Sequence, residues 1–178
     1  MLNQKNGTLL VSMAVILAGC GPPEVVDVTQ YLGKTQPEIV KILGEPSSSW
    51  SYLEEVESLR GREWVRQHYA ALKKSGEICY DLDQKPLPAP LRELKCLFSN
   101  SGYCHQVVGI TKDYDSPERV LKAIGLGNLE VRSQSPDRLG FSYNIPPFER
   151  VQVHKPSSVQ RYSNFSIFNG KSGNPKLE

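Results

Sequence analysis

The sequence predicts an α+β domain in which short helices pack on an antiparallel sheet. Two short segments, 35–44 and 115–125, carry the same helix design, and several other segments alternate apolar and polar residues as strands do. The expected strands are Glu77–Leu82, Leu94–Phe98, Tyr103–Thr111, Leu129–Ser133, Leu139–Ile145, Arg150–Val153 and Asn164–Phe168. A turn signal at 99–102 favours a hairpin between two of them.

Residues 1–19 are expected to be a signal peptide. They contain one charge, Lys5, and no acid, and the ten residues from Leu9 to Ala18 include one polar residue, Ser12. A basic start, a short apolar run and small residues at its end are typical of secretory signals. Ten residues are too few to cross a bilayer, which needs about 20.

The apolar run closes with Leu17-Ala18-Gly19-Cys20, which resembles the lipobox of bacterial lipoproteins. The resemblance implies cleavage before Cys20, acylation of its thiol and new amino group, and a lipidated tether over 20–29. Several acyl chains hold a protein on a membrane essentially permanently. Residue 21 is Gly, not the Asp that signals inner-membrane retention in this family. The expected location is therefore the outer membrane, facing the periplasm, in a Gram-negative host, and the outer face of the cell membrane otherwise. An ordinary signal peptide is the alternative.

The mature chain is nearly neutral. Without residues 1–19 it has 20 Lys+Arg (21 minus Lys5) and 19 Asp+Glu, a net charge of +1. This balance argues against a nucleic-acid partner, which requires a basic face. The length suits one folded α+β domain, expected over 30–168, followed by a polar tail at 169–178 that is expected to be disordered.

Beyond the expected anchor three cysteines remain: Cys79, Cys96 and Cys104. An exported chain meets an oxidising compartment, so one disulfide and one leftover thiol are expected. Cys96 and Cys104 flank the turn at 99–102 and could face each other across a hairpin, with Cys79 as the competing partner. Spacing alone leaves the pairing open.

The first helix pattern carries a complete set of start and stop signals. Thr35 is an N-cap, Pro37 lies in the first turn, and Glu38 completes a capping box. Gly44 supplies the C-cap and Pro46 prevents continuation of the helix. A short helix with one apolar stripe is therefore expected here.

The second helix pattern, at 115–125, repeats this design, with Asp115, Pro117 and Glu118 at the corresponding positions and a glycine at the end. The recurrence suggests a tandem pair of helix-then-strands units whose joint lies near 112–115. Convergence on a good short helix is the other explanation.

A longer helix is expected from Leu53 to Lys74, split near Gly61, with a short strand or helix entry before it. Four aromatic residues lie in or just before it: Trp50, Tyr52, Trp64 and Tyr69. Packing in the core is the simpler interpretation. A partner-binding patch is the alternative, because Trp and Tyr dominate interface hot spots. Three basic residues could form the rim of such a patch: Arg60, Arg62 and Arg66.

The first helix and its flanks read Gly-x-Thr-x-x-Glu-Ile-Val-x-x-Leu-Gly-x-Pro from Gly33 to Pro46. This string resembles the opening of the small lipoproteins of the outer-membrane protein assembly family (SmpA/OmlA/BamE type), although the chain is longer and has three extra cysteines. It is also similar to tandem β-lactamase-inhibitor-like folds. The first resemblance implies a non-enzymatic lipoprotein that binds another envelope protein as an assembly or scaffold subunit. The second implies an inhibitor-like or small-ligand-binding lipoprotein that uses a concave sheet face.

No catalytic or metal-binding arrangement is expected. The histidines, His68, His105 and His154, lack metal-ligand spacing, and Cys104 and His105 are adjacent on a strand and so point to opposite faces. No serine nucleophile motif or phosphate loop occurs in the sequence. We therefore expect no enzyme activity, no metal, and no cofactor other than the covalent lipid on Cys20.

Overall fold

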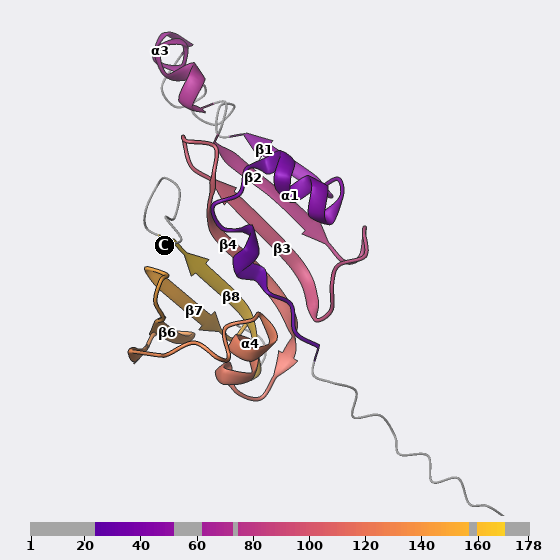
Figure 1. The fold of residues 1–178 in the computed structure, drawn as a ribbon, viewed down its shortest axis with the longest axis vertical. Coiled ribbons are helices and arrows are strands. Elements are labelled where there is room, and N and C mark those ends of the chain that lie inside the picture. The colour runs from indigo at the N-terminus through magenta and orange to yellow at the C-terminus, as the bar shows by residue number, and fades with distance from the viewer. Residues whose placement is uncertain (1–23, 52–61, 73–74, 157–159, 170–178) are drawn as a thin grey trace, which may run out of the picture.

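The computed structural model describes residues 24–51, 62–72, 75–156 and 160–169. The expected signal peptide, Cys20 and most of the expected tail lie outside these ranges. Eight antiparallel strands form one sheet and short helices pack against it, so the fold is α+β and dominated by strands (Figure 1). Within the described ranges, no helix is both long enough and apolar enough to span a bilayer.

The sheet consists of two four-stranded meanders that meet along β4 and β8. The strands are β1 (Ser48–Ser51), β2 (Gly76–Asp81), β3 (Leu91–Phe98), β4 (Cys104–Tyr114), β5 (Ser133–Pro136), β6 (Gly140–Asn144), β7 (Arg150–His154) and β8 (Tyr162–Phe168). Their order in the sheet is β1-β2-β3-β4-β8-β7-β6-β5, and every neighbouring pair is antiparallel. The last strand of each meander therefore lies in the middle of the sheet.

Each meander follows a short helix. The helices are the 3-10 helix η1 (Val28–Tyr31) and the α-helices α1 (Gln36–Leu43), α3 (Arg62–Leu72) and α4 (Pro117–Ala123). α1 precedes β1–β4 and α4 precedes β5–β8, and the chain passes from β4 to α4 at 115–116. α3 lies between β1 and β2, whereas residues 137–139 connect β5 to β6 directly.

α1 forms where the capping signals predict a helix. Glu38 Oε2 accepts hydrogen bonds from the backbone N and the hydroxyl of Thr35, each 2.7 Å long. Gly44 follows the helix with φ of +80°, in the region that favours glycine. Ile39 is fully buried, whereas Ile42 is 47% exposed, so one stripe of α1 packs on the sheet.

The domain begins before the predicted boundary at residue 30. Val26 and Val28 are buried, and their backbone N–H groups donate to the carbonyls of Ala123 (2.9 Å) and Ile124 (3.3 Å) at the end of α4. The predicted tether is therefore part of the packed domain from Val26 onward, and it joins the start of the chain to the second meander.

One expected element differs from the structure. The segment expected as the strand Leu129–Ser133 is irregular up to its last residue, and β5 takes its place over Ser-Gln-Ser-Pro. β5 is wholly exposed and is held by pairing with β6, so no alternation of apolar residues marks it. The expected long helix is described only as α3, and the segment at Trp50 is the edge strand β1.

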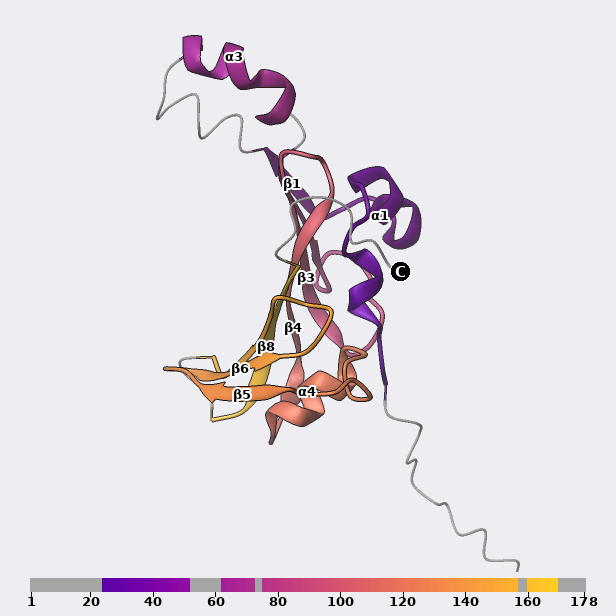
Figure 2. The same cartoon turned by 60° about the vertical axis from the view of Figure 1, so that its left-hand side comes forward.

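The described helices that pack on the sheet cover one of its two faces. η1, α1 and α4 lie on the same side (Figure 2), and the buried side chains of the strands form the core beneath them. The core includes Ile78, Leu94, Val107, Val153 and Ile167, each fully buried. Residues that alternate with these are half-buried or exposed. We call this second side the open face.

Candidate partner-binding surface

α3 follows β1 in the chain and lies beyond the end of the sheet where β1 ends (Figures 1 and 2). Among the described elements, η1 and α4 make extensive contacts with the strands, and α3 does not. A helix of 11 residues is only marginally stable in water on its own. The described side chains of α3, those of Trp64, His68 and Tyr69 among them, are exposed and so are accessible to another molecule.

Trp64 and His68 form one flat surface on α3. Their ring centroids lie 4.0 Å apart, with the planes inclined by 19°. His68 Nδ1 lies 2.9 Å from the Trp64 carbonyl oxygen, to which its N–H can donate, and this holds the imidazole against the indole. Trp64 is 38% exposed and Tyr69 is 47% exposed. Core packing, the simpler prediction for these aromatic residues, is therefore not what the structure has.

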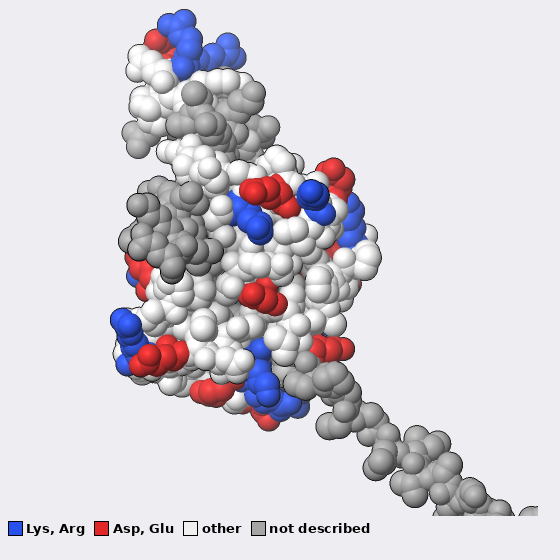
Figure 3. Space-filling model, viewed as in Figure 1, with Lys and Arg blue, Asp and Glu red and all other residues white. Residues whose placement is uncertain are grey.

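The segment between β1 and β2, which includes α3, has a net charge of +1. Residues 52–75 contain five Lys or Arg residues (Arg60, Arg62, Arg66, Lys73 and Lys74) and four acids (Glu54, Glu55, Glu57 and Glu63). Arg66 pairs with Glu63 at 3.0 Å, but both side chains are exposed, and such a pair contributes at most about 1 kcal/mol. Figure 3 shows basic side chains at the outer end of α3.

A row of outward-facing residues crosses the open face at the end nearest α3, and we call it the distal row. Its members are successive cross-strand partners in the register of the sheet: Trp50, Glu77, Leu97, Gln106, Phe168 and Arg150. Trp50 is 38% exposed. Tyr52, the remaining aromatic candidate, lies outside the described residues. The distal row thus places three apolar side chains, those of Trp50, Leu97 and Phe168, on a sheet face that no described helix covers.

A hollow of about 570 Å³ opens beside the distal row, at the turn between β3 and β4. His105 lines it and is the extra residue of a bulge in β4. Its ring meets Phe168 edge-on, with centroids 5.7 Å apart at 84°. His105 Nδ1 is buried without a hydrogen-bond partner among the described residues. Burial lowers the pKa of His105, so its imidazole is neutral at pH 7.

The centre of the open face is polar. One row runs through Cys79, Lys95, Val108, Ser166, Gln152 and Ser142. Gln152 Nε2 donates to Ser142 Oγ at 3.2 Å, and Ser166 Oγ accepts from Gln106 Nε2 at 2.9 Å. Hydrogen bonds between neighbouring side chains therefore satisfy part of this face without a covering helix.

The three described cysteines are free thiols and lie on both faces. Cys79 is half-buried on the open face, whereas Cys96 and Cys104 are buried on the helix-covered face. The neighbouring thiol of Cys104, together with burial, raises the pKa of Cys96 well above its usual value. This contact favours a Cys96–Cys104 pair over either pair with Cys79. His105 lies against Phe168 of the open face, whereas Cys104 is buried on the helix-covered face.

Sequence reasoning did not identify His105, Leu97 or Phe168 as site residues. Leu97 and Phe168 alternate with the buried Cys96 and Ile167, and this alternation could have placed both on the outward side. The bulge at His105 has no sequence signal, because it arises from the register between two strands.

Comparison with known proteins finds no match to this chain among family models, curated proteins or solved structures. The resemblances noted in the sequence therefore remain predictions.

Proposed function

We propose that this chain is a non-enzymatic outer-membrane lipoprotein that binds another envelope protein as an assembly or scaffold subunit. In a host with one membrane it would sit on the outer face of that membrane. The observation that carries the proposal is the exposure of Trp50, Trp64 and Tyr69 at one end of the domain. Because Trp and Tyr supply most interface hot spots, this end is the expected contact.

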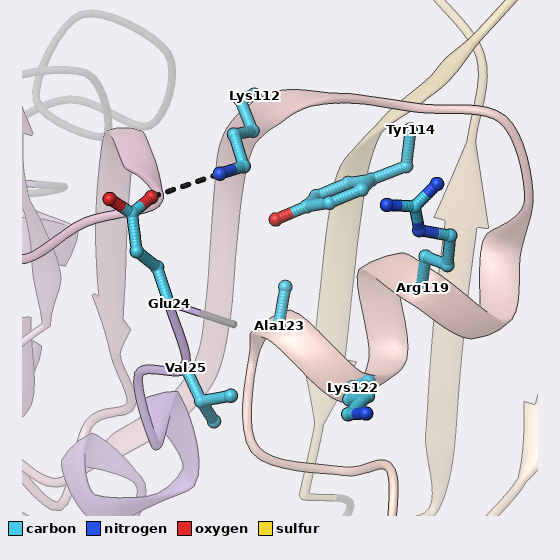
Figure 4. A pocket seen from close by; sticks show the side chains of 7 residues that line it. All are labelled: Glu24, Val25, Lys112, Tyr114, Arg119, Lys122 and Ala123. Atoms are coloured by element: carbon cyan, nitrogen blue, oxygen red, sulfur yellow. Dashed lines mark hydrogen bonds and ion pairs between the residues drawn. The ribbon is translucent and has the colours of Figure 1, made fainter. Parts of the chain in front are cut away.

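The position of the chain's start supports this arrangement. Glu24, the first described residue, lies beside α4 (Figure 4), and α3 lies at the other end of the domain (Figure 1). Cys20 precedes Glu24 by four residues. A lipid on Cys20 would therefore hold the domain by the end opposite α3.

The charge of α3 indicates the chemistry of the partner. α3 carries two arginines, Arg62 and Arg66, against one acid, Glu63, beside exposed aromatic rings, and this suits an apolar groove with acidic side chains at its rim. Complementary charge would speed the encounter, and the aromatic anchors would supply most of the affinity.

Crosslinking and pull-down from solubilised envelopes test the proposal. Trp64→Ala and Tyr69→Ala are each expected to cost about 2 kcal/mol of binding, or roughly 30-fold in affinity, if these residues are hot spots. Leu139→Ala is the matched control, since it truncates an apolar side chain that is 48% exposed at the β5–β6 turn. Recovery of the wild-type chain alone, at native abundance, would count heavily against a scaffold role.

The anchor has its own test. Cys20→Ala should lose lipid labelling and either stay uncleaved or move to the soluble fraction. Persistence of a cleaved Cys20→Ala chain in the membrane fraction would show that the lipobox interpretation is wrong.

An inhibitor-like or small-ligand-binding lipoprotein is the second candidate, favoured by the topology. We infer that the two helix-plus-meander halves are a tandem pair of units, as the β-lactamase-inhibitor-like resemblance implies. The polar centre of the open face would then be the binding surface. Lys95→Ala and Gln152→Ala would weaken binding in that case and Trp64→Ala would not, which is the reverse of the first proposal.

A further inference from the structure

A pocket of about 260 Å³ lies at the end of the domain opposite α3. Three parts of the chain line it (Figure 4): the N-terminal segment with Glu24, β4 with Lys112 and Tyr114, and α4 with Arg119 and Lys122. The lining holds three cationic side chains and one carboxylate. Figure 3 shows basic side chains gathered beside the start of the described chain.

The cations of this pocket are positioned by neighbouring groups. Lys112 Nζ lies 2.9 Å from Glu24 Oε2, and this hydrogen bond raises the pKa of Lys112. Arg119 is held by Asp115 at 3.0 Å, with its guanidinium 5.6 Å from the centroid of the Tyr114 ring.

Lys122 is different, because its side chain forms no ion pair or hydrogen bond recorded within the described chain. The pocket lining therefore includes one ammonium without a partner among the described residues, that of Lys122, and two cations that are already oriented.

The distance from this pocket to a membrane is limited by the chain itself. If Cys20 is lipidated, as the proposed function requires, only three residues lie between the anchor and Glu24, which is four residue steps away. An extended chain spans at most about 3.6 Å per residue, so Glu24 lies within roughly 14 Å of the anchored cysteine. Lys112, in contact with Glu24, is then within reach of the headgroup region.

We propose that this pocket binds the phosphate of a phospholipid headgroup in the membrane that holds the anchor. Lys122 and Arg119 receive the phosphate oxygens, the Tyr114 ring forms the wall beside them, and the Glu24–Lys112 pair marks the edge next to the tether. Anchoring through Cys20 alone would leave the domain free to rotate on its tether. Headgroup binding adds a second attachment and fixes α3 on the side away from the bilayer. This inference rests on the proposed lipid anchor.

Hydrogen–deuterium exchange on the full mature chain tests the proposal, after mass spectrometry has confirmed the lipid on Cys20. The lipidated chain is compared in phospholipid vesicles and in maltoside micelles, which contain no phosphate. We expect amide exchange in α4 to slow about tenfold in vesicles relative to micelles. Arg119→Gln combined with Lys122→Gln should abolish the difference. The matched control is Lys41→Gln with Arg138→Gln, two exposed cations elsewhere, which should leave it unchanged.

Each other outcome overturns the proposal in an identifiable way. Equal exchange of α4 in vesicles and micelles, with the lipid present on Cys20, would refute headgroup binding and leave the anchor intact. The same slowing in micelles with millimolar inorganic phosphate would assign the pocket to a soluble phosphate compound instead. Absence of lipid from Cys20 would overturn both the anchor and the headgroup site.

Discussion

Gly109 lies where the two meanders meet, and its replacement is the most direct test of that junction. It pairs with Leu94 of β3 and Phe165 of β8. A Cβ at position 109 would lie 2.5 Å from Phe165 Cζ and 2.7 Å from the carbonyl oxygen of Glu93. Normal contacts between carbon atoms are about 3.5–4.0 Å, so the ring of Phe165 has to move by about 1 Å.

The stability lost in Gly109→Ala depends on how tightly the ring of Phe165 is packed. Phe165 is 2% exposed, so it can move only by disturbing packed neighbours. Overpacking of this kind costs about 1–3 kcal/mol, while replacing glycine by alanine in a strand returns about 0.5–1 kcal/mol. We expect Gly109→Ala to lower the free energy of unfolding by about 1–2 kcal/mol, measured by urea denaturation of the Cys20→Ala chain.

A double-mutant cycle separates the steric cause from a general effect of the substitution. Phe165→Leu removes the atoms that collide, so Gly109→Ala should cost at least about 1 kcal/mol less in that background. The rescue is partial because the Glu93 carbonyl remains. Gly44→Ala is the control: its Cβ would meet no atom within 4 Å, and its cost, from φ of +80°, should be the same in both backgrounds. An equal cost of Gly109→Ala with Phe165 and with Leu at position 165 would refute this packing.

Three further predictions concern the helix-covered face. Ile39→Ala should lower the free energy of unfolding by about 2–5 kcal/mol, and Ile42→Ala on the exposed side of the same helix by less than about 1 kcal/mol; similar values would mean that α1 packs differently. Non-reducing mass spectrometry of the exported protein should find any disulfide between Cys96 and Cys104, and a bond from either one to a third cysteine would contradict the observed contact. Burial raises the pKa of Tyr31 to about 12, so its contribution to stability is complete below pH 10 and is lost as the pH rises from about 10 to about 12. Stability curves against pH should therefore fall less steeply over this range in Tyr31→Phe, and an unchanged slope would contradict the assignment.

The elements that could be predicted are those with local causes. α1 follows from hydrogen bonds between Thr35 and Glu38 and from the positive φ of Gly44, all within one short segment. Most strands follow from the alternation of buried and half-buried residues. β5 could not be predicted, because only its pairing with β6 makes Ser133–Pro136 a strand.

Features that depend on distant partners were not accessible from the sequence. The pairing of β4 with β8 joins Gly109 to Phe165, and no local pattern encodes that choice. In the candidate surface, Trp64 and Tyr69 of α3 could be identified from the sequence, because Trp and Tyr are the residue types that dominate interface hot spots. His105 did not, since its buried Nδ1 results from a bulge and from contact with Phe168.

The central position of β8 bears on how the protein folds. β4 is the longest of the described strands and carries several buried apolar residues. It pairs on one side with β3, the strand just before it in the chain, and on the other with β8, the last strand to be synthesised. Until β8 arrives, the first meander is complete except for an unpaired β4 edge. Such an edge is a template for pairing with other chains. A chain that stalls during export before Tyr162 would therefore be the most aggregation-prone intermediate, and a chaperone would be most useful while β4 waits for its partner.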